Sequence, residues 1–66
     1  MKQDCINLMR KIYQDPDKAD TRALYEFSNS WYPTDFLYEN GYIYKTTEGI
    51  WHLTDKAYSH MGWLKI

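Results

Sequence analysis

The sequence predicts a mainly α-helical domain that carries one small β-hairpin, with about four helices and two strands. Apolar side chains recur at helical spacing over most of the chain, whereas two short runs rich in β-branched and aromatic residues flank a polar turn that ends in Gly49. Residues 1–66 are expected to form a single domain, since no linker, repeat or low-complexity tract divides them. So short a chain buries only about 60% of its unfolded surface, which predicts a modest core.

The composition narrows the class of protein. A formal net charge of −1, from eight basic and nine acidic residues, gives no long-range attraction to polyanions or to a membrane surface. No apolar run approaches the roughly 20 residues that span a bilayer. Cys5 is the only cysteine and no secretory signal is visible, so we expect a cytoplasmic protein without an internal disulfide. Aromatic residues make up 18% of the chain, so several rings should lie at the surface.

The first half of the chain is expected to form two helices. Apolar side chains at three-and-four spacing predict a helix over Gln3–Gln14. Pro16 ends it, because proline cannot donate a hydrogen bond inside a helix, and a short loop follows. The second helix begins after Asp20, whose carboxylate can accept from the free amides of the first turn, and Ser28-Asn29-Ser30 ends it.

A third helix over Pro33–Asn40 begins with a proline in its first turn and ends at Asn40-Gly41. Two strands, Tyr42–Lys45 and Ile50–Leu53, follow and form the hairpin, in whose turn Gly49 takes a positive φ.

Strand alternation places Trp51 and Leu53 on one face of the second strand, opposite Ile50 and His52. Thr54 then caps a final helix that Gly62 ends, and an apolar tail follows it. The predicted core combines the inward positions of all these elements: Leu8, Ile12, Leu24, Phe27, Phe36, Leu37, Ile43, Leu53, Tyr58 and Met61.

The second half of the chain resembles the winged helix-turn-helix regulators. The resemblance rests on Phe36-Leu37, then Gly41-Tyr42-Ile43, a variable turn, and the run from Trp51 to Ala57 that reads Trp-His-Leu-Thr-Asp-Lys-Ala. It covers roughly residues 20–61, and it is carried by the order of the segments more than by any single motif.

The resemblance implies a small DNA-binding transcriptional regulator. Its recognition helix would be Pro33–Asn40 and its wing Lys45–Gly49, which would meet the major groove and the phosphate backbone of double-stranded DNA. The side chains in these places that can donate to DNA, with two flanking cations, are Thr34, Asn40, Lys45, Thr46, Thr47, Arg22 and Lys56. We also expect a homodimer that pairs through the first helix and the tail from Trp63.

The same segments favour a second interpretation, because the predicted recognition helix holds two acids and no Lys or Arg. An acidic face rich in tyrosine would repel DNA and suit a protein partner, as an adaptor or an inhibitor that could mimic DNA. The residues expected in such an interface are Tyr38, Tyr42, Tyr44, Asp35, Glu39 and Trp63. Trp31 lies nearby, and we interpret it as a core residue.

No catalytic or metal-binding constellation is visible. Asp35 and Glu39 lie four residues apart on one helical face, but no His or Cys is near them in the sequence, so we interpret them as a solvated acidic face. His52 and His60 lack the close ligand spacing of a zinc site. We therefore expect no enzyme, no cofactor and no metal ion.

Overall fold

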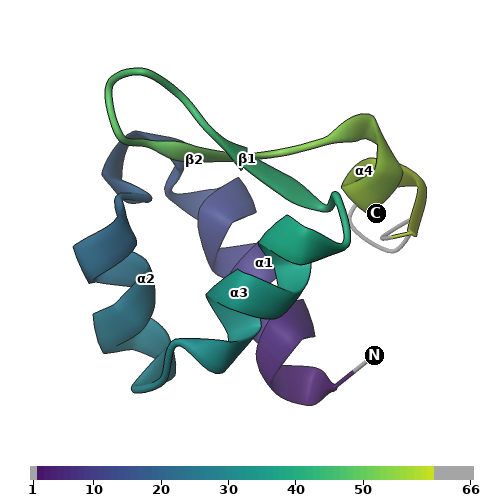
Figure 1. Ribbon diagram of the computed structural model, residues 1–66, viewed down its shortest axis with the longest axis horizontal. Coiled ribbons are helices and arrows are strands. Elements are labelled where there is room, and N and C mark those ends of the chain that lie inside the picture. Colours follow the sequence, from purple (N-terminus) through teal and green to yellow (C-terminus); the bar gives the residue numbers. More distant parts are fainter. Residues whose placement is uncertain (1, 61–66) are drawn as a thin grey trace.

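The computed structural model describes residues 2–60, which form four α-helices, one 3-10 helix and one two-stranded hairpin (Figure 1). The hairpin lies across one end of the three longer helices, and the last helix continues from its second strand. The predicted class, mainly helical with a small hairpin wing, is confirmed. The elements are α1 (Gln3–Gln14), η1 (Pro16–Lys18), α2 (Thr21–Ser28), α3 (Tyr32–Glu39), β1 (Ile43–Lys45), β2 (Trp51–Leu53) and α4 (Asp55–His60).

The helix ends follow from local hydrogen bonding. The bounds of α1 are those predicted, and a single 3-10 turn that begins at Pro16 replaces the expected loop. As predicted, the Asp20 carboxylate caps α2, accepting from the Ala23 amide at 2.7 Å. Asn29 then ends α2 with a φ of 55°. Helix α3 begins at Tyr32, one residue before the predicted start, and Gly41 with a φ of 77° follows its end.

The hairpin has the predicted turn but shorter strands. Gly49 adopts a φ of 85°, as expected for the residue that closes the turn. The antiparallel register pairs Ile43 with Leu53 on the core face and Tyr44 with His52 on the outer face. The predicted alternation of the two faces is thereby confirmed.

A short pairing that the sequence did not predict joins the hairpin to the connection between α1 and α2. Asp20 forms an isolated antiparallel bridge with Ile50, and the Trp51 amide donates to the Ala19 carbonyl at 2.7 Å. The Trp51 indole Nε1 also donates to the Thr21 hydroxyl at 3.0 Å. These bonds fix the hairpin against the first turn of α2.

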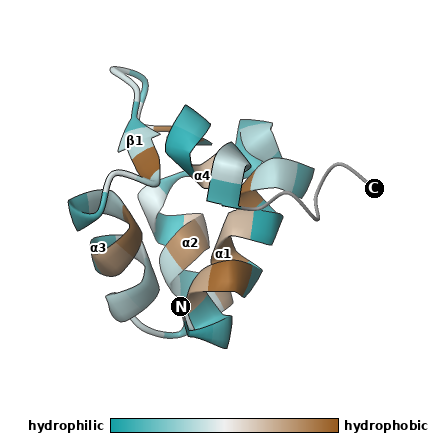
Figure 2. Cartoon of the chain, turned by 90° about the vertical axis from the view of Figure 1, so that its right-hand side faces the viewer, coloured by the Kyte–Doolittle hydropathy of each residue, from teal (hydrophilic) through white to brown (hydrophobic). Residues whose placement is uncertain are grey.

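The core lies between α1, α3 and the inner face of the hairpin, and Figure 2 shows hydrophobic and hydrophilic stretches on the same helices. Two core predictions are wrong: Phe27 is 48% exposed and Tyr58 is 41% exposed. Leu24 is the buried residue of α2, which places Phe27 on the flank, where the Lys11 ammonium lies 5.8 Å from its ring. The buried apolar side chains are Cys5, Leu8, Met9, Ile12, Ala19, Leu24, Leu37, Ile43, Trp51, Leu53 and Ala57.

Two further core predictions have different outcomes. Phe36 is only partly buried, at the margin of the core. Met61 lies outside the described residues, as do Gly62 and the apolar tail from Trp63.

The Cys5 thiol is expected to resist alkylation in the folded protein. Its side chain is fully buried, and this burial, with a smaller effect of Asp4, raises the pKa of the thiol. The thiolate is the reactive form, and burial both disfavours it and excludes the reagent. Only molecules in which Cys5 has become exposed by opening therefore react at neutral pH. We expect iodoacetamide labelling to be slower than in urea by a factor on the order of 10³, the population ratio for an opening free energy of about 4 kcal/mol. Mass spectrometry measures both rates, and equal rates would contradict the burial of Cys5.

Candidate interaction surface

One exposed stripe of α3 carries alternating aromatic and acidic side chains. Trp31, Asp35, Tyr38 and Glu39 stand at positions i, i+4, i+7 and i+8, which lie on one side of a helix. The Asp35 amide donates to the Trp31 carbonyl at 3.0 Å, so the first helical turn includes Trp31. Trp31 is 51% exposed and Tyr38 59% exposed, and both acids are exposed. We name these four residues the aromatic–acidic ridge.

The opposite side of α3 holds the ridge in place. Pro33, Thr34 and Leu37 are buried there, and α3 packs on α1 and against β1. The ridge is therefore presented by a helix whose orientation the core determines. Side chains on such an element lose little conformational freedom when a partner binds.

Ring contacts order both ends of the aromatic–acidic ridge. The Tyr25 ring of α2 lies against the Trp31 ring, with centroids 4.4 Å apart and planes tilted by 35°. At the other end the Tyr38 ring meets the Trp51 ring edge-on, at 5.6 Å and 77°. Both arrangements are favourable for aromatic pairs, and they leave large ring surfaces exposed in set orientations.

The charged side chains of the ridge itself are both acids, whereas two cations flank it: Lys45 lies over the Trp51 ring that Tyr38 contacts, and Lys56 donates to the carbonyl of Asn40, next to Glu39. Glu26 of α2 adds a third exposed carboxylate beside Tyr25 in the sequence, and the nearest cation along α2, Arg22, pairs with it at 3.8 Å. Both partners of this pair are largely exposed, so solvent screens it and it contributes little to stability. The exposed stripe of α3 itself thus offers rings and acids to a ligand.

Several residues predicted to contact DNA are instead buried or form hydrogen bonds within the protein. Thr34 is only 4% exposed, so the prediction that it reads DNA is wrong; its hydroxyl finds no hydrogen-bond partner within residues 2–60. The Asn40 side-chain amide donates to the Phe36 carbonyl at 2.8 Å, a second bond to an oxygen that also accepts from the Asn40 backbone amide at 3.1 Å. The Thr46 hydroxyl accepts from the Ile50 amide at 3.3 Å inside the hairpin turn.

Two of the lysines predicted to bind DNA also make contacts within the protein. The Lys56 ammonium donates to the Asn40 carbonyl at 2.6 Å, a favourable place for a cation at the C-terminus of α3, and lies 4.7 Å from the Tyr42 ring centroid. Lys45 lies 6.0 Å from the Trp51 ring centroid and remains exposed, as does Thr47 at the tip of the turn. Of the predicted set, these two and Arg22 keep exposed side chains without a capping role.

The predicted protein-interface residues fall into separate places. Tyr38 shares the aromatic–acidic ridge with Asp35 and Glu39, whereas Tyr44 lies on the outer face of the hairpin beside His52. Tyr42 is only partly buried, and Trp63 lies outside the described residues. The prediction that Trp31 is a core residue is wrong, because its side chain is exposed and lies against the Tyr25 ring. The seven-residue interval from Trp31 to Tyr38 already puts both on one helical face.

Comparison with known proteins finds no relative: no family model, no curated protein and no solved structure matches this chain.

Among residues 2–60, no group of three or more His, Cys, Asp or Glu side chains could hold a metal ion. Over the same residues, no helix is long and apolar enough to cross a membrane.

Proposed function

We propose that the chain is a protein-interaction domain, an adaptor or an inhibitor, whose aromatic–acidic ridge contacts a basic surface of another protein. The observation that carries this proposal is the common exposed stripe of Trp31, Asp35, Tyr38 and Glu39. Exposed Trp and Tyr are the residues that most often dominate the binding energy of protein interfaces. Acids beside them add charge complementarity, which favours a partner rich in Arg or Lys.

The same stripe argues against direct DNA recognition. Double-stranded DNA is bound through cations on phosphates and through donors on base edges, and the exposed stripe of α3 supplies carboxylates. A partner that itself binds nucleic acid would meet, on this domain, an acidic surface in place of phosphates. An inhibitor that mimics DNA is the form of the proposal that this charge pattern favours.

A titration with a basic peptide tests the proposal. The probe is a fluorescein-labelled peptide of alternating Arg and Gly, followed by anisotropy as salt is raised. We expect the peptide to bind with an affinity that falls as salt is raised. Trp31→Ala should lower this affinity by at least about tenfold, the effect of one interface hot spot. Asp35→Lys should have a similar effect. Asp4→Lys, the same charge change at an exposed acid of α1, is the matched control and should leave the affinity within about twofold.

The outcomes separate the two classes of partner. Equal weakening by Asp35→Lys and Asp4→Lys would show attraction to net charge alone and would contradict a site on α3. A labelled DNA duplex is titrated in parallel at low salt, where we expect no binding. Binding of the duplex that falls steeply with salt and is reduced by Lys45→Ala would support the alternative function, a DNA-binding transcriptional regulator.

That alternative is favoured by the order of elements, which resembles the winged helix-turn-helix domains: two short helices, the second exposed, followed by a hairpin with Lys45 and Thr47 at its accessible end. A regulator of this type would gain affinity by pairing as a homodimer, since two weak half-sites then add. A buried free thiol suits the reducing cytoplasm, which we propose as the compartment for either function.

A further inference from the structure

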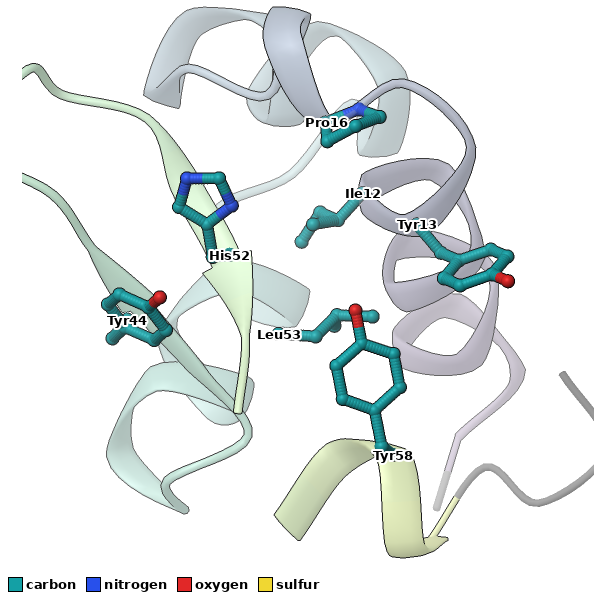
Figure 3. A pocket seen from close by; sticks show the side chains of 7 residues that line it. All are labelled: Ile12, Tyr13, Pro16, Tyr44, His52, Leu53 and Tyr58. Carbon is teal, nitrogen blue, oxygen red and sulfur yellow. The ribbon is translucent and has the colours of Figure 1, made fainter. Parts of the chain in front are cut away.

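A groove runs along β2, between the hairpin and the end of α1, away from the aromatic–acidic ridge. One hollow of about 260 Å³ lies between β2, the end of α1 and α4 (Figure 3). A second hollow of about 230 Å³ adjoins it towards the hairpin turn, and both are lined by Pro16 and His52. Among residues 2–60, no side chain of α3 lines either hollow. We name the two hollows together the hairpin groove.

Aromatic rings wall the end of the hairpin groove near α4. Tyr13 and Tyr58 form one wall, with ring centroids 6.3 Å apart and planes at 74°, and Tyr44 with His52 forms the other, at 5.7 Å. Figure 3 shows Ile12 and Leu53 between these walls, and it shows the Tyr58 hydroxyl directed into the hollow while that of Tyr13 points away. This end therefore offers flat apolar surfaces and a hydrogen-bonding hydroxyl.

The other end of the hairpin groove is acidic. Asp17 of η1 and Glu48 of the hairpin turn both line it, together with Thr46 and Ile50. No Lys or Arg among the described residues lines either hollow. The groove thus changes along its length from aromatic to anionic, which complements a ligand that is apolar at one end and positively charged at the other.

The size of the hollows points to a peptide. Pockets for small molecules usually measure roughly 300–1,000 Å³ and enclose most of their ligand, whereas each of these hollows is smaller and open. A shallow groove walled by aromatic rings suits the polyproline II conformation, whose proline rings pack flat on aromatic side chains. The backbone carbonyls of that conformation have no internal partners and can accept from a hydroxyl such as that of Tyr58.

We propose that the hairpin groove binds an extended, proline-containing segment of a partner protein, with a proline in the aromatic hollow and an Arg or Lys between Asp17 and Glu48. Such a segment is already extended before it binds, so ordering it costs little, and a shallow groove can hold it. This binding is independent of the ridge on α3. A partner that used both surfaces would gain affinity through linkage of two weak contacts.

Anisotropy of a short labelled peptide tests the proposal on the full chain. The probe is fluorescein-labelled and consists of five prolines followed by one Arg; a second probe carries Glu in place of the Arg. We expect the Arg probe to bind at least about fivefold more tightly than the Glu probe, and Tyr44→Ala to weaken it by about tenfold. Tyr38→Ala removes another exposed tyrosine, from the ridge, and is expected to leave the affinity unchanged.

A charge reversal tests the orientation of the bound peptide and keeps every aromatic ring of the groove. In the variant with Asp17→Lys and Glu48→Lys, the preference is expected to invert, so that the Glu probe binds more tightly than the Arg probe. A structural defect would weaken both probes together and would not invert their order. Absence of binding up to about 1 mM, or an order of affinities that the reversal leaves unchanged, would overturn the proposal. Because the ridge is untouched by these variants, the Arg-Gly titration still tests the function proposed for α3.

Discussion

Trp51→Ala is expected to lower the free energy of unfolding by about 3–5 kcal/mol, the usual cost of truncating a buried aromatic side chain. Trp51 is 7% exposed and joins three parts of the fold. Its indole donates to Thr21 at the start of α2, its ring meets Tyr38 of α3 edge-on, and Lys45 of β1 lies over its face. Its truncation leaves a cavity and also leaves these groups without their contacts.

The loss should be large compared with the total stability. At about 0.05–0.15 kcal/mol per residue, a domain of this length is stable by roughly 3–10 kcal/mol, so the variant should be partly or wholly unfolded at room temperature. Urea unfolding followed by circular dichroism measures the difference. Trp51→Phe is the matched control: it keeps a ring and loses the bond to Thr21, so it should cost clearly less. A Trp51→Ala variant within about 1 kcal/mol of the parent would contradict the placement of this side chain.

The double variant Asp35→Lys and Glu39→Lys is expected to gain affinity for double-stranded DNA. Both positions are exposed on α3, and the replacements turn an acidic stripe into a basic one on the helix that would face the major groove in the DNA-binding alternative. Each new phosphate contact should add about 0.9 to the slope of log affinity against log salt, so we expect a slope of about 2. Anisotropy of a labelled duplex at several salt concentrations measures it.

The control for this variant has the same charge in another place. Each replacement of an acid by Lys adds two positive charges, so two replacements change the formal charge from −1 to +3. Asp4→Lys with Asp17→Lys makes the same change on α1 and η1, and it should give weaker binding with a smaller slope. Equal slopes would mean that net charge alone attracts DNA, and no gain in either variant would mean that α3 is not a surface that DNA can reach.

The sequence predicted the elements well because their ends depend on local chemistry. Asp20 caps α2 and Gly49 closes the hairpin turn through interactions with residues only a few positions away, so both could be inferred from neighbouring residues. The failures concern rotation of a helix about its axis. Phe27 fitted the apolar stripe of α2, but packing against α1 and α3 selected Leu24 and left Phe27 on the flank.

The candidate site was predicted only in part, for a related reason. The acids Asp35 and Glu39 were placed correctly on an exposed helical face, because a four-residue interval fixes their common direction. The bonds of Asn40, Thr46 and Lys56 depend on where the ends of α3 and the hairpin turn lie in space. Propensity and spacing do not reveal which polar side chains form hydrogen bonds within the fold. The number of side chains available to DNA was therefore overestimated.

The bridge between Asp20 and Ile50 determines how the molecule unfolds as well as how it is shaped. A hairpin with three-residue strands is too short to persist alone in water, and here it depends on bonds from Trp51 to Ala19 and Thr21, about thirty residues earlier in the chain. The loop between these partners contains all of α2 and α3. Opening the hairpin therefore removes the contacts that Trp51 makes with α2 and α3, and we expect both candidate binding surfaces to be lost in one cooperative step.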